Sequence, residues 1–114
     1  MDFKVSKGLK KDKDFRRVYQ QGKSFANKYL VIYIMKNNLD ESRVGISVSK
    51  KIGKAVVRNK VKRRIREAFR ILVDKNIKKG YDVVFIARLS SNECEYKDIE
   101  KSVVNLCKKS KILK

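Results

Sequence analysis

The stretch RVGISVSKKIGKAVVRNKVKRRIREAFR, residues 43–70, carries the clearest structural pattern in the sequence. In residues 43–49, apolar side chains alternate with polar or small ones, which predicts a strand with one buried face and one polar face. A basic loop containing Gly53 follows. A helix is then predicted from about Val57 to Lys75, because its apolar side chains fall within an arc of about 100°. These side chains are Val61, Ile65, Ala68, Phe69 and Leu72.

The segments on either side of residues 43–70 are predicted to form further strands and helices. Residues 81–88, YDVVFIAR, form a near-continuous apolar run, which predicts a central strand covered on both faces. Residues 25–36 are aromatic and β-branched, which predicts strand with a break near Asn27. Helices are predicted at 12–21, where Asp12 or Asp14 holds the first turn and Gly22 is the C′ residue, and at 96–109.

The order of these elements, α-β-β-β-α-β-α, predicts an α+β fold in which helices pack on a small mixed β-sheet. For the strand–helix–strand unit spanning 43–88, base rates favour a right-handed crossover. Nothing resembles a linker, so residues 1–114 are predicted to form a single domain. Residues 1–8 are expected to be a flexible basic arm, and residues 108–114 a basic tail.

The charge balance is strongly positive, with 31 Lys and Arg against 12 Asp and Glu and a net charge of +19 over 114 residues. Such self-repulsion works against a compact state, and a polyanionic partner would relieve it. Nucleic acid is the first candidate partner and an anionic membrane surface the second. No segment has the roughly 20 apolar residues that span a bilayer, and the N-terminal residues do not form a signal peptide.

The sequence lacks histidine, which is the commonest general base near neutral pH. We therefore expect no catalytic residue and no metal site in this polypeptide. Cys94 and Cys107 are too few for a zinc site and are expected to be free thiols in a reducing cytoplasm. Cys107 falls on the apolar stripe of the last helix.

The predicted central helix carries a basic face beside its apolar one. On a helical wheel, Asn59, Lys62, Arg63, Arg66 and Arg70 occupy a contiguous arc. In an ordinary surface helix both signs of charge would be mixed, whereas segment 50–70 holds ten Lys or Arg and one acid, Glu67. This arrangement favours a phosphate-binding surface over a merely solvated face.

A second candidate surface combines aromatic and small polar side chains. Phe15 and Tyr19 share one face of the predicted first helix, and Tyr33 lies on a strand. Bases of an unpaired strand stack on such rings, so this surface suits single-stranded nucleic acid. The alternative, that Phe15 and Tyr19 only dock the helix on the sheet, stays equally open.

At these residues the sequence resembles bacterial ribonuclease P proteins. The resemblance rests on residues 43–70, on DFRRVYQQGKSFANKYLVIY at 14–33 and on YDVVFIAR at 81–88. The Arg-Asn-Arg element of that family falls on Arg58, Asn59 and Lys60, where lysine keeps the charge without the guanidinium fork. The residues predicted to bind the RNA subunit are Arg58, Asn59, Lys60, Lys62, Arg63 and Arg66, with Arg70 added from the wheel.

The resemblance also implies a cleft that holds the 5′ leader of precursor tRNA. Its candidate residues are Phe15, Tyr19, Val31, Tyr33, Ser47, Ser49, Lys50 and Lys51. The implied fold is ribonuclease P protein-like, of the ribosomal protein S5 domain 2-like kind, with a left-handed crossover around the basic helix.

The implied function is that of the protein subunit of ribonuclease P, an endonuclease that removes the leader by hydrolysis to give the mature tRNA 5′ end. The active site is expected in the RNA subunit, which would hold the Mg²⁺. Ribonuclease P RNA and precursor tRNA are the expected partners, with no membrane and no obligate protein partner. The rivals are a general RNA-binding protein, a DNA-compacting protein and a binder of anionic membranes.

Overall fold

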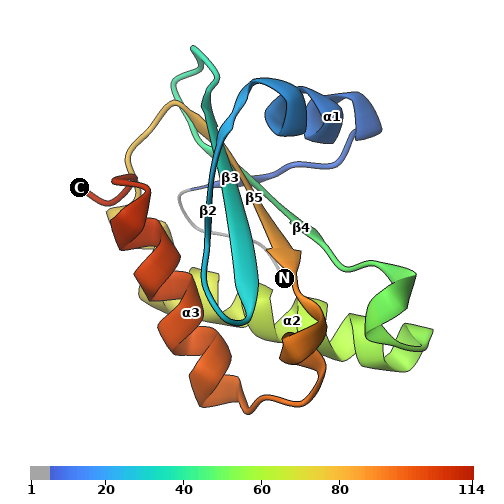
Figure 1. Ribbon diagram of the computed structural model, residues 1–114. Helices are drawn as coiled ribbons and strands as arrows, with labels where there is room; N and C mark the ends of the chain where they lie inside the picture. The colour runs from blue at the N-terminus through green and yellow to red at the C-terminus, as the bar shows by residue number, and fades with distance from the viewer. Residues whose placement is uncertain (1–5) are drawn as a thin grey trace.

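The computed structural model describes residues 6–114 as a five-stranded sheet with three α-helices and three short 3-10 helices (Figure 1). The strands are β1 (Lys7–Gly8), β2 (Lys23–Ala26), β3 (Leu30–Lys36), β4 (Arg43–Ser47) and β5 (Tyr81–Ala87). The α-helices are α1 (Asp12–Gln21), α2 (Ala55–Leu72) and α3 (Tyr96–Lys109), and the 3-10 helices are η1 (Lys50–Ile52), η2 (Asp74–Asn76) and η3 (Leu89–Asn92).

The sheet is mixed, with strand order β1-β4-β5-β3-β2. β5 lies at its centre, parallel to β4 and antiparallel to β3, as the apolar run at 81–88 predicted. Only Ile86 and Tyr81 in this strand are partly exposed. The predicted α+β class is therefore confirmed, with β1 as an additional short strand.

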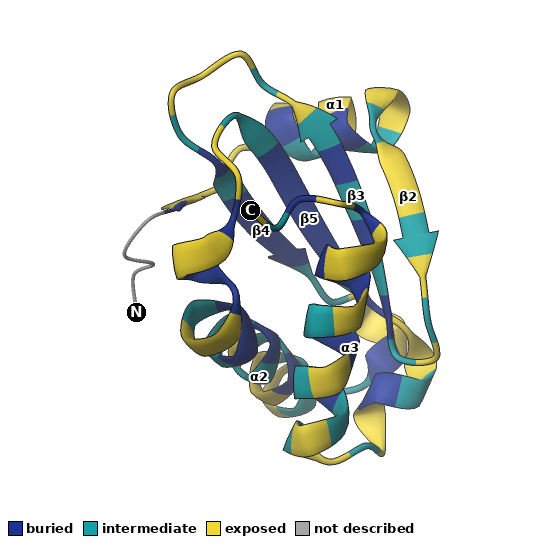
Figure 2. Ribbon diagram, turned by 90° about the vertical axis from the view of Figure 1, so that its left-hand side faces the viewer, coloured by how far each residue is buried: buried dark blue, intermediate teal, exposed yellow. Residues whose placement is uncertain are grey.

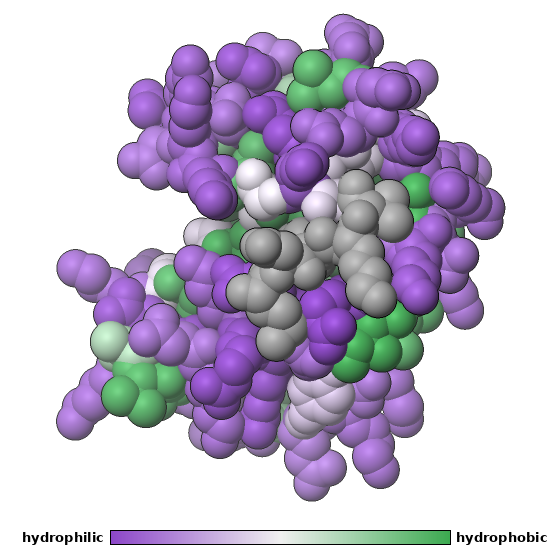
Figure 3. Space-filling model, turned by 180° about the vertical axis from the view of Figure 1, so that it is seen from behind, coloured by the Kyte–Doolittle hydropathy of each residue, from purple (hydrophilic) through white to green (hydrophobic). Residues whose placement is uncertain are grey.

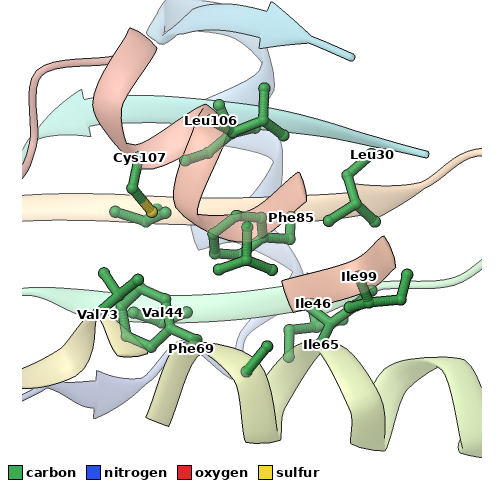
Figure 4. Packing of buried hydrophobic residues seen from close by; sticks show 14 of the residues in the cluster. Leu30, Val44, Ile46, Ile65, Phe69, Val73, Phe85, Ile99, Leu106 and Cys107 are labelled. Carbon is green, nitrogen blue, oxygen red and sulfur yellow. The ribbon is translucent and has the colours of Figure 1, made fainter. Parts of the chain in front are cut away.

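The main core fills the space between one face of the sheet and the two long helices (Figures 2 and 4). Ile65 and Phe69 of α2 point toward Phe85 of β5, with the Phe69 and Phe85 rings 5.8 Å apart in an edge-on arrangement. Leu106 and Cys107 of α3 enter the same core and are fully buried. Cys94 and Cys107 are both free thiols, and Cys107 lies on the apolar stripe as predicted.

The crossover from β4 through α2 to β5 is left-handed. Both strands run downward in Figure 2, where the face covered by α2 and α3 is turned toward the viewer and β5 lies to the right of β4. When this view is turned so that both strands point up, with the helices still in front, β5 lies to the left of β4, which defines a left-handed crossover. The expectation from base rates is wrong here, and the hand implied by the family resemblance is the one observed.

The break predicted near Asn27 is a tight connection between β2 and β3. The Asn27 side-chain oxygen accepts hydrogen bonds from the backbone N–H groups of Tyr29 and Leu30, at 3.3 and 3.1 Å. Such bonds stabilise a turn in place of a continued strand. The Asn27 amide also donates to the Ser102 carbonyl of α3 at 3.1 Å, which fixes the hairpin against that helix.

Several predicted helix details differ from the structure. α2 begins at Ala55 and ends at Leu72, and Leu72 is 39% exposed, so its assignment to the core was wrong. Lys11 is the N-cap of α1, and neither Asp12 nor Asp14 caps it. Gly22 closes α1 with an extended, negative φ and is not a left-handed C′ residue.

Both chain ends, where the structure describes them, are tied to the fold. The Ser6 N–H donates to the buried Asp74 carboxylate at 2.9 Å, and β1 pairs with Arg43 and Val44 of β4. The expected flexible arm is therefore wrong for residues 6–8, and its residues 1–5 lie outside the described part. At the other end, Ile112 is fully buried, so the basic tail is docked on the domain.

An ion-pair network fastens α1 to the sheet on the face opposite the main core. The Arg43 guanidinium donates to both carboxylate oxygens of Asp82, at 2.8 and 2.6 Å, and lies 3.6 Å from Asp14 of α1. Asp82 is fully buried and also accepts from the Asn37 amide at 2.9 Å. Within residues 6–114, no helix is long and apolar enough to cross a membrane.

Candidate nucleic-acid interface

The aromatic side chains predicted for the leader cleft come together where α1 meets the sheet. The rings of Phe15 and Tyr19 lie 6.4 Å apart, and those of Tyr19 and Tyr33 5.2 Å apart in an edge-on arrangement. All three rings pack against a second, smaller cluster centred on Val18 and Val84. These rings therefore dock α1, and they remain partly exposed beside it, while their role in binding a single strand stays a prediction.

The sheet face under α1 is covered in one row and open in the next. The strand register places Gly45, Val84 and Tyr33 side by side, and then Ser47, Ile86 and Val31. In the first row, Val84 is fully buried. The second row, here called the open strip, consists of Val31, Ser47 and Ile86, all of them partly exposed.

Gly45 is needed because a ring rests on its backbone. A Cβ at this position would lie 2.5 Å from Cζ of Phe15, well inside van der Waals contact. The absence of a side chain lets Phe15 approach the sheet and sets the height of α1 above it. The sequence pattern placed Gly45 on the polar face but did not reveal this contact.

The Tyr19 hydroxyl lies at the edge of the open strip. Its pKa is raised above the usual 10.0, mainly because burial disfavours the phenolate. The hydrogen bond with Ser47 acts in the opposite direction and the neighbouring Tyr33 adds to the rise. Tyr19 is therefore a neutral hydroxyl at physiological pH, able to donate or accept a hydrogen bond.

Ser49, Lys50 and Lys51 lie beyond the end of β4 and not within the strip. The strand stops at Ser47, so the predicted continuation to Ser49 was wrong. Ser49 is the N-cap of η1, whose Ile52 is buried and anchors the turn. Lys50 and Lys51 are exposed just beyond the strand that contributes Ser47 to the open strip, and their charge suits a phosphate chain.

The basic face of α2 carries most of the residues predicted to bind the RNA subunit. Asn59, Lys60 and Arg63 are exposed, and Arg58, Lys62 and Arg66 are partly exposed. In the described chain, salt bridges join only Arg17, Arg43 and Arg70 to acids, so these cations have none. The buried Nε of Arg58 also has no hydrogen-bond partner among residues 6–114.

Arg70 differs from that set in having an acidic partner. It pairs with Glu67, the one acid of α2, and its pKa is raised chiefly by this hydrogen bond. Charge from Tyr96 of α3 also acts on it. Arg70 follows Arg66 by one helical turn on the same face of α2, but its guanidinium is already paired with an acid.

A hollow of about 1070 Å³ joins the aromatic cluster to the basic helix. Phe15 lines one end and Lys62 and Arg66 the other, with β1 and the edge of β4 between them. Figure 3 shows the surface hollowed between the part that carries α1 and the part that carries the start of α2. A strand in this hollow could therefore contact Phe15 of the aromatic cluster and two cations of the basic face.

Sequence reasoning missed some residues of this interface. Ile86 lies in the open strip, and Leu9 and Lys10 line the hollow. The apolar run at 81–88 concealed which of its side chains faced the strip, because only the register with Val31 and Ser47 reveals it. Leu9 and Lys10 gave no periodic signal, because they follow a two-residue strand.

Comparison with known proteins gives one consistent result. The family model described as "Ribonuclease P" matches residues 3–111. A "Ribonuclease P protein component" of Clostridioides difficile (strain 630) is 65% identical over 112 residues, which cover 98% of each chain.

Solved structures agree with the sequence comparison. The RNase P protein of Staphylococcus aureus superposes with a TM-score of 0.86 at 40% identity, covering 96% of this chain and 99% of that one. The RNase P protein from Thermotoga maritima gives a TM-score of 0.81 at 37% identity, covering 90% of this chain and 96% of that one.

Proposed function

The chain belongs to the ribonuclease P protein family, and on that premise we propose that it binds two RNAs at adjoining surfaces. Membership makes it a protein component of ribonuclease P, an endoribonuclease of tRNA processing, with ribonuclease P RNA as its partner. The proposal assigns the basic face of α2 to that RNA, and the open strip with its aromatic wall to the 5′ leader of precursor tRNA.

The assignment of α2 to the RNA subunit is supported by its unpaired cations. Lys62 and Arg66 stand beside the core without an acidic partner in the described chain, and the buried Arg58 Nε lacks an acceptor. Phosphate oxygens would supply the missing acceptors, and Arg can do so in a forked geometry. Asn59 adds a side chain that can recognise a base edge as well as a phosphate.

The assignment of the leader is carried by one observation, the contrast between the two rows of the sheet. α1 covers the row of Gly45, while the row of Ser47 stays open next to Tyr19 and Tyr33. An unpaired base could stack on these rings, and the Tyr19 and Ser47 hydroxyls could bond its edge. A duplex offers no such unstacked face, so the strip favours a single strand.

In this proposal the RNA subunit, and not the protein, carries out the hydrolysis. Among residues 6–114, no three His, Cys, Asp or Glu side chains gather as a metal site would require. Oxygen ligands are what Mg²⁺ prefers, and the interface described above is cationic, so these residues do not fit the ion. We propose that the RNA subunit holds Mg²⁺ and the active site, while the protein orients the leader and neutralises phosphates.

The leader assignment can be tested with the variant Tyr19→Ala. With ribonuclease P RNA present, loss of one stacking ring should weaken binding of precursor tRNA by about 1–3 kcal/mol, roughly 5- to 150-fold. Binding of mature tRNA, which lacks a leader, should stay unchanged. Shortening the leader should remove the difference between the wild-type protein and the variant.

The matched control is Tyr29→Ala, which removes a partly buried ring from the main-core side of the sheet. It should affect precursor and mature tRNA alike. Equal losses for both substrates with Tyr19→Ala would instead favour a general RNA-binding role.

A further inference from the structure

The docked C-terminus brings two lysine-rich segments together. Ile77 and Leu113 form an antiparallel bridge, and the N–H of Lys78 donates to the Ile112 carbonyl at 2.7 Å. The N–H of Lys114 donates to the Asn76 carbonyl, also at 2.7 Å. The C-terminal lysine cluster is defined here as the exposed residues Lys75, Lys78, Lys79, Lys108, Lys111 and Lys114; Lys109, also exposed, instead donates to the Ala26 carbonyl at 3.3 Å.

This cluster has no exposed acid within its two segments. The nearby Asp74 is 1% exposed and accepts the Ser6 N–H at 2.9 Å. None of the six lysines belongs to a salt bridge within residues 6–114. The first half of α3, in contrast, mixes its lysines with Asp98 and Glu100. The cluster therefore shares with the basic face of α2 the feature that points to a polyanion.

Helix electrostatics explain only part of the cluster. Lys108 lies in the last turn of α3, where positive charge favours the helix dipole. Lys111 follows that turn directly, whereas Lys78 and Lys79 belong to another segment, outside any α-helix, so the dipole of α3 does not account for them. Their charges add repulsion to a chain that already carries +19.

Lys111 stands where the backbone favours glycine. α3 ends in a Schellman motif, in which the N–H of Lys111 bonds the Lys108 carbonyl and that of Ile112 the Cys107 carbonyl. Lys111 occupies the C′ position with φ 61°. The other described residue with positive φ that is not glycine is Asn38, which tolerates this conformation. A lysine is thus held at a strained position that a glycine would relieve.

The cluster lies away from the interface described above. In Figure 1 the C-terminus is on the opposite side of the molecule from α1 and the start of α2. The longest extent of the protein is 36 Å, so a surface on the opposite side can contact a different segment of a large RNA. All six side chains are lysines, which act as compact point charges and can contact phosphates without base specificity.

We propose that the C-terminal lysine cluster is a second RNA-binding surface, which contacts backbone phosphates of a separate helical segment of the RNA subunit. The proposal rests on the proposed function, because it takes ribonuclease P RNA as the partner. Lys111 is its most informative residue, since its charge is retained at the expense of backbone strain.

The test uses the variant Lys111→Gly, which separates folding from binding. Glycine relieves the left-handed backbone, so the melting temperature should rise while affinity for a ribonuclease P RNA transcript falls. The double variant Lys78→Gln with Lys111→Gln should flatten the plot of log affinity against log salt by about one for each lost phosphate contact. The matched control is Lys97→Gln with Lys101→Gln, which removes the same charge beside Glu100.

Affinity and salt dependence should be lowered by the cluster variants and left near wild type by the control. Equal effects of both double variants would overturn the proposal, because net charge alone would then account for them. Unchanged binding by Lys111→Gly would also overturn it. Failure of the wild-type protein itself to bind this RNA would instead contradict the proposed function.

Discussion

At the scale of single residues, the interface depends on one close contact between a ring and a bare backbone. Phe15 rests on Gly45, and this contact sets how far α1 stands from the sheet. The aromatic pair Phe15 and Tyr19 could be predicted from their spacing on a helix, and Tyr33 from strand alternation. The contact with Gly45 could not be predicted, because it joins two elements about thirty residues apart in sequence.

The variant Gly45→Ala should therefore damage both stability and leader binding. The new methyl group would force Phe15 to move, at about 1–3 kcal/mol for an overpacked site. Urea denaturation measures the first effect, and the precursor-to-mature affinity ratio the second. Gly8→Ala is the control, because a Cβ there would meet only the end of the Lys10 side chain at 3.6 Å. Equal stability of the two variants would contradict the contact.

The buried thiol of Cys107 gives the fold a dependence on alkaline pH. Burial raises its pKa from 9.0 to about 12, so the folded state keeps a proton that the unfolded state loses. Its contribution to the free energy of unfolding is complete below pH 9 and is lost as the pH rises toward 12.

Between pH 8 and pH 10.5, the stability advantage of the wild-type protein over Cys107→Ala should therefore shrink by about 2 kcal/mol. Chemical denaturation at both pH values measures this change. Cys94→Ala, which removes a partly exposed thiol, should show a smaller change in relative stability between the two pH values. If the difference in unfolding free energy between the wild-type protein and Cys107→Ala did not change with pH, burial would be excluded as the cause of a raised thiol pKa.

At the scale of elements, the periodicity of apolar residues predicted the bounds of α1 and α3 most accurately. The bounds of α1 and α3 match the prediction, because their apolar stripes begin and end sharply. The end of α2 was predicted less well, since Leu72 continues the stripe in sequence but lies at the margin of the core. The docked tail was missed because two apolar residues among lysines carry no periodicity.

The docked tail should contribute measurably to stability. Ile112 is fully buried in the main core, so Ile112→Ala should cost about 2–5 kcal/mol of unfolding free energy. Ile71→Ala, at a position that is 56% exposed, should change it by no more than about 0.5 kcal/mol. Thermal or urea denaturation of the two variants compares them directly. A neutral Ile112→Ala would mean that the tail does not hold its position in solution.

At the scale of the whole molecule, the sequence determined the class of fold but not its connectivity. The strand order β1-β4-β5-β3-β2 depends on contacts between distant segments, and local patterns do not encode it. The left-handed crossover runs against the general preference, so only resemblance to a family indicated it. The hollow between Phe15 and Arg66, which joins the two predicted surfaces, likewise appears only when β1 and β4 are paired.

This arrangement explains how a chain without histidine can serve a ribonuclease. Phe15 of α1 and the cations Lys62 and Arg66 of α2 line one hollow, and Tyr19 and Tyr33 lie beside Phe15. We propose that the protein thereby holds an RNA scaffold and a substrate strand together. Substrate positioning of this kind lowers a reaction barrier without a catalytic side chain. We propose that the protein acts by completing an RNA enzyme.

Reconstitution tests this claim most directly. The purified protein is mixed with a bacterial ribonuclease P RNA and precursor tRNA at low Mg²⁺, and 5′ cleavage is compared with that of each component alone. We predict efficient cleavage by the mixture, little by the RNA alone and none by the protein. If the protein adds nothing across salt and Mg²⁺ titrations, the account is contradicted, and a general RNA-binding role replaces it.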